Sequence, residues 1–262
     1  MLPVTSREYK VMLDHRMFAQ RMDALGELQR DLQRLAKRIQ LAIEGKWSKP
    51  KKRSIRFLDT CDGAVNANNF ILRYRRKPGA DEPGELTLKC RIEDRYLAAG
   101  ASIYARDRLD GETKFEEDIA APFRSRFSHS QTVDNPAATP PATIGEAAEI
   151  FPALGNLRRD GRICSAATPL ETVGGLVPRE RVYKGVDFFL ASGVRASAAV
   201  ILWSASWKGR VNFAEFSFRY GSETEDYEAA TARQAYDLFA AIQRLDWCLP
   251  DGRTKTQFAY GG

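Results

Sequence analysis

The sequence is poor in histidine and cysteine and lacks any long apolar run. Its 262 residues include two histidines and four cysteines, and the cysteines form no CxxC pair. A zinc site built from cysteine and histidine needs such clusters, so the sequence argues against one. No run of about 18 apolar residues occurs, so no transmembrane helix is expected. The first residues lack the basic start and apolar core of a secretory signal, and we expect free thiols and a cytoplasmic location.

Glycine-rich phosphate loops and a strong charge surplus are also missing. Neither GxGxxG nor GxxxxGK[ST] occurs, which argues against a Rossmann or P-loop nucleotide site. Forty Lys and Arg stand against 34 Asp and Glu, a net charge of +6. This small surplus indicates an anionic partner without specifying its kind, whereas the lack of basic motifs interleaved with aromatic residues does not favour a nucleic-acid partner.

Segments rich in β-branched and aromatic residues, separated by Gly, Pro and Asp turn signals, predict eight strands. The strands are expected at 4–13, 53–60, 69–77, 85–93, 112–120, 179–190, 198–207 and 210–220. Apolar periodicity predicts helices at 17–45, 145–157 and 225–245, and the Ser/Thr/Pro-rich segment 128–143 is expected to be a loop. We therefore expect one α+β domain over 1–262, an eight-stranded antiparallel β-barrel flanked by helices, enlarged by the long helix and the Pro-rich loop.

Two segments leave alternatives open. In the long predicted helix, Leu25, Leu28, Leu32 and Leu35 step by three and four and form one apolar stripe. This stripe either packs on the barrel or forms the seam of a homodimer. The following segment, 46–56, carries Lys and Arg but no acid. It is either a solvated loop or a rim that attracts anions.

Charged residues recur at alternate positions of five predicted strands. Successive strand residues point to opposite faces, so the charges gather on one face and the apolar residues on the other. The charged faces are Glu8 with Lys10, Arg73 with Arg75, Lys89 with Arg91, Lys114 with Glu116 and Asp118, and Glu215 with Arg219. A half-exposed sheet in water explains this pattern, and so does a closed barrel whose charged faces line the lumen. In a lumen, the cations would hold phosphate oxygens and the carboxylates would hold Mg²⁺ or Mn²⁺.

These residues resemble the CYTH, or triphosphate tunnel metalloenzyme, superfamily in order along nearly the whole chain. The family's first strand has the pattern ExExK, and later strands carry Asp-Thr, LRxR, TLK, RxExE, a basic motif and a closing ExE. The matching segments are 6–10 (SREYK), 56–60 (RFLDT), 72–75 (LRYR), 86–89 (LTLK), 114–118 (KFEED), 179–184 (RERVYK) and 215–217 (EFS), followed by the late lysine Lys255.

The resemblance implies an eight-stranded tunnel that binds triphosphate-bearing molecules, as thiamine, inorganic and RNA triphosphatases and a class of adenylate cyclases do. The basic residues implied to bind phosphate oxygens are Lys10, Arg73, Arg75, Lys89, Arg91, Lys114, Arg181, Arg219 and Lys255. The acidic residues implied to hold Mg²⁺ or Mn²⁺ are Glu8, Glu116, Asp118 and Glu215. A metal-activated water would attack the terminal phosphorus. Ser6 and Ser217 replace two acids of the family pattern, and a hydroxyl is a poorer ligand for a hard divalent ion.

Three functions are therefore considered. The first is a divalent-metal-dependent phosphohydrolase, a triphosphatase of CYTH type, that binds a triphosphate or polyphosphate in a basic lumen. The second is a tunnel that binds polyphosphate, nucleotide or another anion with weak or no catalysis, which Ser6 and Ser217 favour. The third is a nucleic-acid- or partner-binding protein that uses the segment 46–56 and the long helix. The expected partner is a small-molecule polyphosphate or nucleotide.

Overall fold

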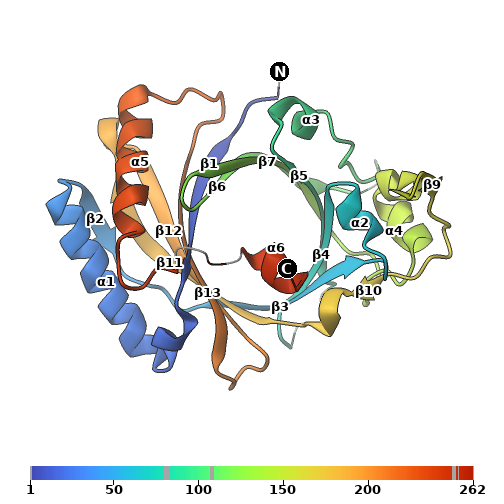
Figure 1. Cartoon of the computed structure of the whole chain (residues 1–262), viewed down its shortest axis with the longest axis horizontal. Coiled ribbons are helices and arrows are strands. Elements are labelled where there is room, and N and C mark those ends of the chain that lie inside the picture. Colours follow the sequence, from blue (N-terminus) through green and yellow to red (C-terminus); the bar gives the residue numbers. More distant parts are fainter. Residues whose placement is uncertain (1, 80–82, 107–108, 250–251, 253, 262) are drawn as a thin grey trace.

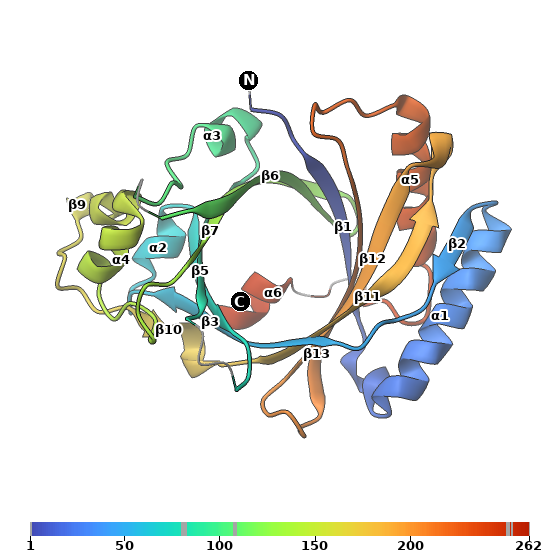
Figure 2. The ribbon, with the colours of Figure 1, turned by 180° about the vertical axis from the view of Figure 1, so that it is seen from behind.

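Nine strands pair into a closed ring (Figures 1 and 2). The computed structural model describes residues 2–79, 83–106, 109–249, 252 and 254–261. In order around the ring, the strands are β3 (Lys51–Asp59), β4 (Phe70–Arg76), β5 (Glu85–Ile92), β7 (Arg124–Asp134), β6 (Gly111–Ala120), β1 (Ser6–Leu13), β13 (Val211–Gly221), β12 (Arg195–Ser204) and β11 (Arg179–Phe189). The ring closes where β11 pairs with β3, with Glu180 opposite Arg53. Two short strands, β2 (Ala42–Gly45) and β10 (Glu171–Thr172), pair with β11 and β3 outside this circuit.

The expected α+β class is confirmed, but the predicted strand number is wrong. The eight predicted strands all occur in the ring, and their ends lie within three residues of the predicted ends. The ninth is β7, of which residues 128–134 were expected to be loop. Its segment carries the small hydroxyl residues Ser128, Ser130 and Thr132 on one face, so it lacks an alternation of large apolar residues. The wholly antiparallel arrangement is also wrong, because β1 and β6 run parallel with Ser6 opposite Glu116.

Two helices, α1 (Arg21–Arg38) and α5 (Ala229–Ile242), cover the outer face of the ring beside β11, β12 and β13 (Figure 1). Leu25, Leu28 and Leu32 of α1 are buried in one core with outward residues of these strands, such as Phe188 and Phe218. The leucine stripe therefore packs on the ring and is not available as a dimer seam. The predicted helix 17–45 is shorter at both ends in the structure, where α1 spans 21–38, residues 17 and 18 belong to a 3-10 turn, and residues 42–45 form β2.

Smaller elements cover the other outer side. The helices there are α2 (Ala64–Ala67), α3 (Arg95–Ala99) and α4 (Ile144–Ile150), and the hairpin strands are β8 (Arg158–Arg159) and β9 (Arg162–Ile163). Short 3-10 turns occur at His15–Phe18, Pro152–Asn156, Val173–Gly175 and Ala191–Gly193. Ile144 and Phe151 pack against outward residues of the strands, including Leu72 and Leu88. In the described part of the chain, no helix combines the length and hydrophobicity that a membrane crossing requires.

The C-terminal helix α6 (Lys255–Ala259) lies within the outline of the ring (Figures 1 and 2). Two aromatic side chains at the end of this segment contact aromatic residues of the inner wall. Phe258 of α6 packs edge-on against Trp203, and Tyr260, which follows α6, packs against Phe57. The Tyr260 hydroxyl also donates to Asp59 at 3.1 Å. These contacts hold α6 against an apolar part of the inner wall.

His129, on the outward face of β7, makes the stability sensitive to acid. The side chain is fully buried between the rings of Phe115 and Tyr104, and burial lowers its pKa. Below about pH 6.5 the histidine is protonated in the unfolded chain but stays neutral in the folded chain. The free energy of unfolding therefore falls by up to about 1.4 kcal/mol per pH unit. Urea unfolding from pH 7.5 to 5 should show this slope, and His129→Leu should reduce it. The matched variant His15→Leu, at a less buried position, should keep it. An equal slope in His129→Leu and wild type would contradict the assignment.

Candidate functional site

The inward faces of the ring strands surround a cavity of about 210 Å³. Nine basic and six acidic side chains of the described residues line it, which is a surplus of three positive charges. The basic residues are Lys10, Arg53, Arg73, Arg75, Lys89, Arg91, Lys114, Arg219 and Lys255, and the acidic residues are Glu8, Glu112, Glu116, Asp118, Glu180 and Glu215. Charges that leave bulk water need opposite charges nearby, so this excess of cations suits an anionic ligand.

Strand alternation explains why the charges point inward. In β1, Tyr9 and Val11 are buried in the outer core under the helices, whereas Glu8 and Lys10 line the cavity. The same alternation holds in β13, where Phe216 is buried outside and Glu215 lines the cavity. Because helices cover the outer face, the charged faces are the lining of a lumen and not the wet side of an open sheet.

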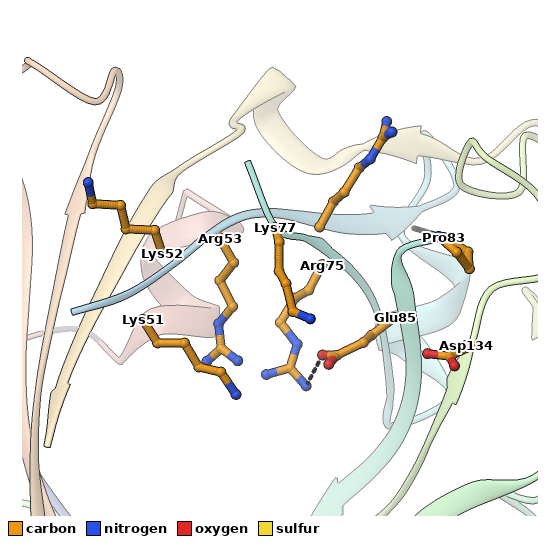
Figure 3. A pocket seen from close by; sticks show the side chains of 9 residues that line it. Lys51, Lys52, Arg53, Arg75, Lys77, Pro83, Glu85 and Asp134 are labelled. Atoms are coloured by element: carbon orange, nitrogen blue, oxygen red, sulfur yellow. Dashed lines mark ion pairs between the residues drawn. The ribbon is translucent and has the colours of Figure 1, made fainter. Parts of the chain in front are cut away.

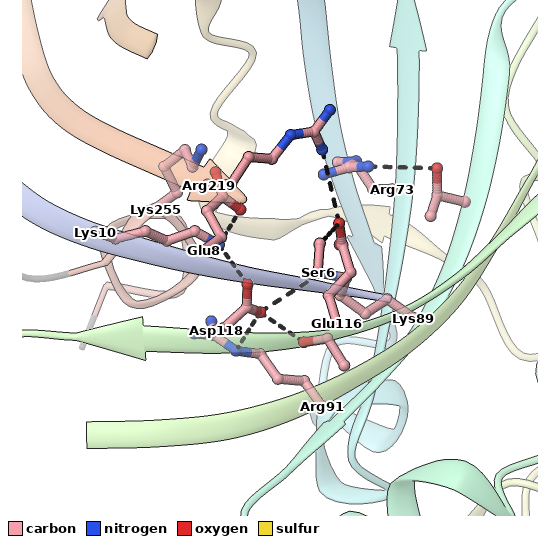
Figure 4. Close-up of polar contacts among 12 residues, drawn as sticks. Ser6, Glu8, Lys10, Arg73, Lys89, Arg91, Glu116, Asp118, Arg219 and Lys255 are labelled. Carbon is pink, nitrogen blue, oxygen red and sulfur yellow. Dashed lines mark hydrogen bonds and ion pairs between the residues drawn. The ribbon is translucent and has the colours of Figure 1, made fainter. Parts of the chain in front are cut away.

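Asp118 is the centre of a buried ion-pair network (Figure 4). Its Oδ1 lies 2.6 Å from the Lys10 ammonium, and its Oδ2 accepts a hydrogen bond from Ser128 at 2.6 Å. The Arg91 Nε and Lys89 Nζ atoms lie 3.3 and 3.6 Å from the same Oδ2. Burial alone would raise the pKa of Asp118, but the three cations hold that pKa well below its usual range. Asp118 is therefore a carboxylate whose two oxygens are both engaged.

The other three acids proposed as metal ligands are also paired with cations. The Lys10 ammonium lies 2.9 Å from Glu8, and it lowers the pKa of Glu8 to about 2 against the opposing effect of burial. Lys255 lies 2.7 Å from Glu215, which is 1% exposed. For Glu116, the same Oε1 atom accepts a hydrogen bond from Ser6 at 3.0 Å and lies 3.7 Å from an Arg219 nitrogen.

Arg73 differs from these residues because no described carboxylate lies within ion-pair distance of it. Its contact is a long hydrogen bond of 3.4 Å to the Thr87 hydroxyl, and its Nε is buried without a hydrogen-bond partner. The pKa of Arg73 is lowered to about 9; burial is the largest cause, and repulsion from Arg75 and Arg53 adds to it. Those two neighbours do have acidic partners, since Arg75 lies 3.4 Å from Glu85 and Arg53 pairs with Glu180. Arg73 is thus a cavity cation that forms no close ion pair with a described carboxylate, and the acids that act on it, Glu180 and Glu85, are paired with Arg53 and Arg75.

A basic mouth adjoins the cavity where β3, β4 and β5 meet (Figure 3). Its described lining residues are Lys51, Lys52, Arg53, Arg75, Arg76, Lys77, Pro83, Glu85 and Asp134. Arg53 and Arg75 line both this hollow and the main cavity, so the two lie next to each other. For the basic segment 46–56, the rim interpretation is therefore the better one from residue 51 onward, where the chain is β3. The other side of the cavity is lined by Thr254, Lys255 and Thr256 at the start of α6.

Twelve of the thirteen predicted site residues line the cavity, and Arg181 does not. Arg181 is on the outward face of β11, where it donates to the Ser204 hydroxyl at 3.1 Å and to the Trp207 carbonyl. Its neighbour Glu180 faces the cavity instead. A shift of one residue in a strand exchanges its two faces, which is why a motif match without a known register selected the wrong residue for the lumen.

Sequence reasoning missed several residues that the structure adds to the lining. They are Arg53, Glu112 and Glu180 among the charged residues, and Thr87, Ser130 and Thr132 among the hydroxyl residues. The signal for Arg53 and Glu112 was available, since each lies two residues from another inward position of its strand. Ser130 and Thr132 belong to β7, whose existence the sequence did not indicate.

The donor set does not fit a divalent cation in this arrangement. Among the described residues, no three His, Cys, Asp or Glu side chains come close enough to hold one metal ion. The four acids that the resemblance assigns to Mg²⁺ or Mn²⁺ each have a Lys or Arg partner. The Ser6 hydroxyl, opposite Glu116 in the paired strand, donates a hydrogen bond to that carboxylate and so engages it further.

No protein-family model and no curated protein matches the chain. The chain is similar to a solved structure from Bacillus halodurans, provisionally assigned as an adenylate cyclase, at 12% identity and a TM-score of 0.43, covering 98% of this chain and 99% of the other. A second similar structure is a provisionally assigned adenylyl cyclase from Hippeastrum, described as revealing a dominant triphosphatase activity. Its sequence identity is 12% and its TM-score 0.42, and the match covers 98% of this chain and 96% of the other. A third structure, from Vibrio parahaemolyticus and also provisionally assigned as an adenylate cyclase, has a sequence identity of 14% and a TM-score of 0.38, and the match covers 97% of each chain. Values this low do not show a family.

Proposed function

We propose that this protein binds a small polyanion, a triphosphate- or polyphosphate-bearing molecule, inside the ring. The observation that supports this proposal most directly is Arg73, a guanidinium in the cavity wall beside Arg75 and Arg53 and without a described carboxylate partner. A buried charge among like charges is costly in the free protein. Phosphate oxygens at this point would place negative charge directly beside Arg73, and a guanidinium can hold them bidentately.

The distribution of cations favours an extended anion over a compact one. Arg75 lies at the basic mouth, Arg73 and Lys89 follow inside, and Lys255 lies at the α6 side. A chain of linked phosphate groups carries charge along its length, so it can contact several of these cations at once. A single sulfate or phosphate ion can reach only a few of them and should bind more weakly.

A second candidate function is hydrolysis of the bound triphosphate with Mg²⁺ or Mn²⁺. The observation that favours it is that Glu8, Glu116, Asp118 and Glu215 line the same cavity as the cations. These carboxylates are engaged in ion pairs with Lys and Arg side chains. Metal-dependent hydrolysis stays a prediction of the resemblance.

The proposal is tested by calorimetric titration of the purified full chain with tripolyphosphate, ATP and sulfate. We expect tripolyphosphate to bind with a Kd in the micromolar range, on the order of −8 kcal/mol, and sulfate at least about tenfold more weakly. Affinity should fall as salt rises, because charge interactions at the mouth are screened. ATP binding as tight as tripolyphosphate would extend the ligand class to nucleotides. No detectable binding of tripolyphosphate or ATP would overturn the proposal.

Phosphate release from the same two compounds, measured with Mg²⁺ and with Mn²⁺, separates the two candidate functions. Turnover above the protein-free background would establish the phosphohydrolase. Tight binding without turnover would assign the chain as a polyanion-binding protein, as the two serine replacements favour.

A further inference from the structure

Lysine ammonium groups lie among the acidic residues of the cavity. The Lys10 Nζ atom contacts two acids at once, at 2.6 Å from Asp118 and 2.9 Å from Glu8. Lys255 Nζ lies 2.7 Å from Glu215. Lys10 is 12% exposed at its side chain, and Glu215 is 1% exposed, so these are contacts inside the protein and not at its surface.

The oxygens of Asp118 leave little room for a further ligand. Oδ1 faces Lys10, and Oδ2 faces Ser128, Arg91 and Lys89. A divalent ion that bound here would have to displace a charged partner from a buried carboxylate. Breaking a buried ion pair in this way leaves an uncompensated charge and costs several kcal/mol.

The total charge of the cavity also argues against a bound divalent cation. With nine basic and six acidic residues among its described lining, the cavity already has a positive surplus before any metal binds. A polyanion can therefore be balanced by the side chains alone.

We infer that the cavity binds its polyanion without a divalent cation, and that Lys10 and Lys255 supply fixed positive charge among the carboxylates. This inference depends on the proposed function, polyanion binding in the cavity. It assigns Asp118 to positioning Lys10, Lys89 and Arg91. Mg²⁺ is then a competitor for the free anion and not part of the site.

The test is calorimetric titration with tripolyphosphate, once in excess EDTA and once in excess Mg²⁺. We expect binding in EDTA to be as tight as in Mg²⁺ or tighter, because Mg²⁺ complexes the free polyanion. Binding that is at least about tenfold tighter in Mg²⁺ than in EDTA would overturn the inference while leaving the proposed function intact. No binding in either buffer would instead overturn the proposed function.

Mn²⁺ titration of the ligand-free protein, followed by electron paramagnetic resonance, tests the carboxylates directly. We expect no stoichiometric site. A stoichiometric site with a Kd below about 100 μM would overturn the inference, because it would show that a metal displaces the lysines.

Charge removal at the two lysines tests their assigned role. Lys10→Met should weaken tripolyphosphate binding in EDTA by about tenfold or more, which corresponds to one charge-assisted contact. Lys255→Met, on α6 and outside the ring strands, should act in the same direction and serves where Lys10→Met does not fold. Lys37→Met, exposed on α1, is the matched control and should bind like wild type. Unchanged affinity in a folded Lys10→Met or Lys255→Met variant would contradict the role of that lysine.

Discussion

Replacing Arg73 with methionine should remove most of the tripolyphosphate affinity and at the same time make the free protein more stable. A lost charge-assisted contact in a partly desolvated cavity costs about 1.5–3 kcal/mol, so we expect binding to fall by roughly 10- to 100-fold. The stability should rise by about 1 kcal/mol, because Arg73 has no described acidic partner and repels Arg75 and Arg53. Methionine keeps the unbranched apolar stem, so the cavity wall stays packed.

Opposite signs of the two effects distinguish a binding residue from a structural one. Calorimetry gives the affinity, and urea unfolding of the ligand-free variant gives the stability. Arg162→Met, exposed on the β8–β9 hairpin outside the ring, is the matched control and should change neither by more than experimental error. If Arg73→Met binds tripolyphosphate like wild type, the cavity is not the binding site. A marked loss of stability would show that Arg73 has a structural role.

Asp118→Asn should be the most destabilising single change in the cavity. Asparagine keeps the shape but removes the negative charge that Lys10, Lys89 and Arg91 share. Loss of one partner of a buried ion pair costs about 3–5 kcal/mol, which corresponds to a fall in Tm of about 10 °C for a chain of this size. Thermal unfolding of the ligand-free variant measures it.

The bound anion should restore part of this loss. Tripolyphosphate in excess supplies negative charge beside the uncompensated cations, so its addition should raise the Tm of Asp118→Asn more than that of wild type. Asp237→Asn is the matched control, since Asp237 pairs with Arg233 on the exposed face of α5 and its replacement should change stability by less than about 0.5 kcal/mol. A Tm of Asp118→Asn equal to that of wild type would contradict the prediction that the ion pairs of Asp118 stabilise the protein.

Acid should act on Asp118 only at very low pH. Because its folded-state pKa lies well below the ordinary value of 3.8, the carboxylate contributes stability that is present above about pH 4 and is lost as the pH falls below that value. The acid sensitivity between pH 5 and 6.5 should therefore come from His129 and not from the cavity network.

Most of the cavity lining was predictable from local sequence. The inward residues of the predicted strands alternate with apolar residues that the helices cover, as Lys10 alternates with Tyr9 and Val11. Burial of one face forces this alternation, and an alternation of period two can be recognised in a single segment. Their roles in phosphate or metal binding were not decided by this pattern and remain predictions.

The sequence did not indicate β7 because its inward positions are Ser128, Ser130 and Thr132. A strand whose inner face contacts charged groups has no need of large apolar residues there; Ser128, for example, donates to Asp118. Its composition is then close to that of a loop. The structure places Arg181 on the outward face of β11 and not in the lumen for a related reason. The register of a strand is set by the strand it pairs with and not by its own segment.

By itself, the sequence determined the α+β class, eight of the ring strands and which charged residues share a strand face, because these follow from local periodicity and burial. Only the tertiary structure decided that the sheet closes through β3 and β11, that β1 and β6 run parallel, and which charges meet. Lys10 and Asp118 are 108 residues apart in the chain and 2.6 Å apart in space. Such contacts depend on the pairing of distant strands, and so does the difference between Asp118, whose charge is shared by three cations, and Arg73, which has no described acidic partner.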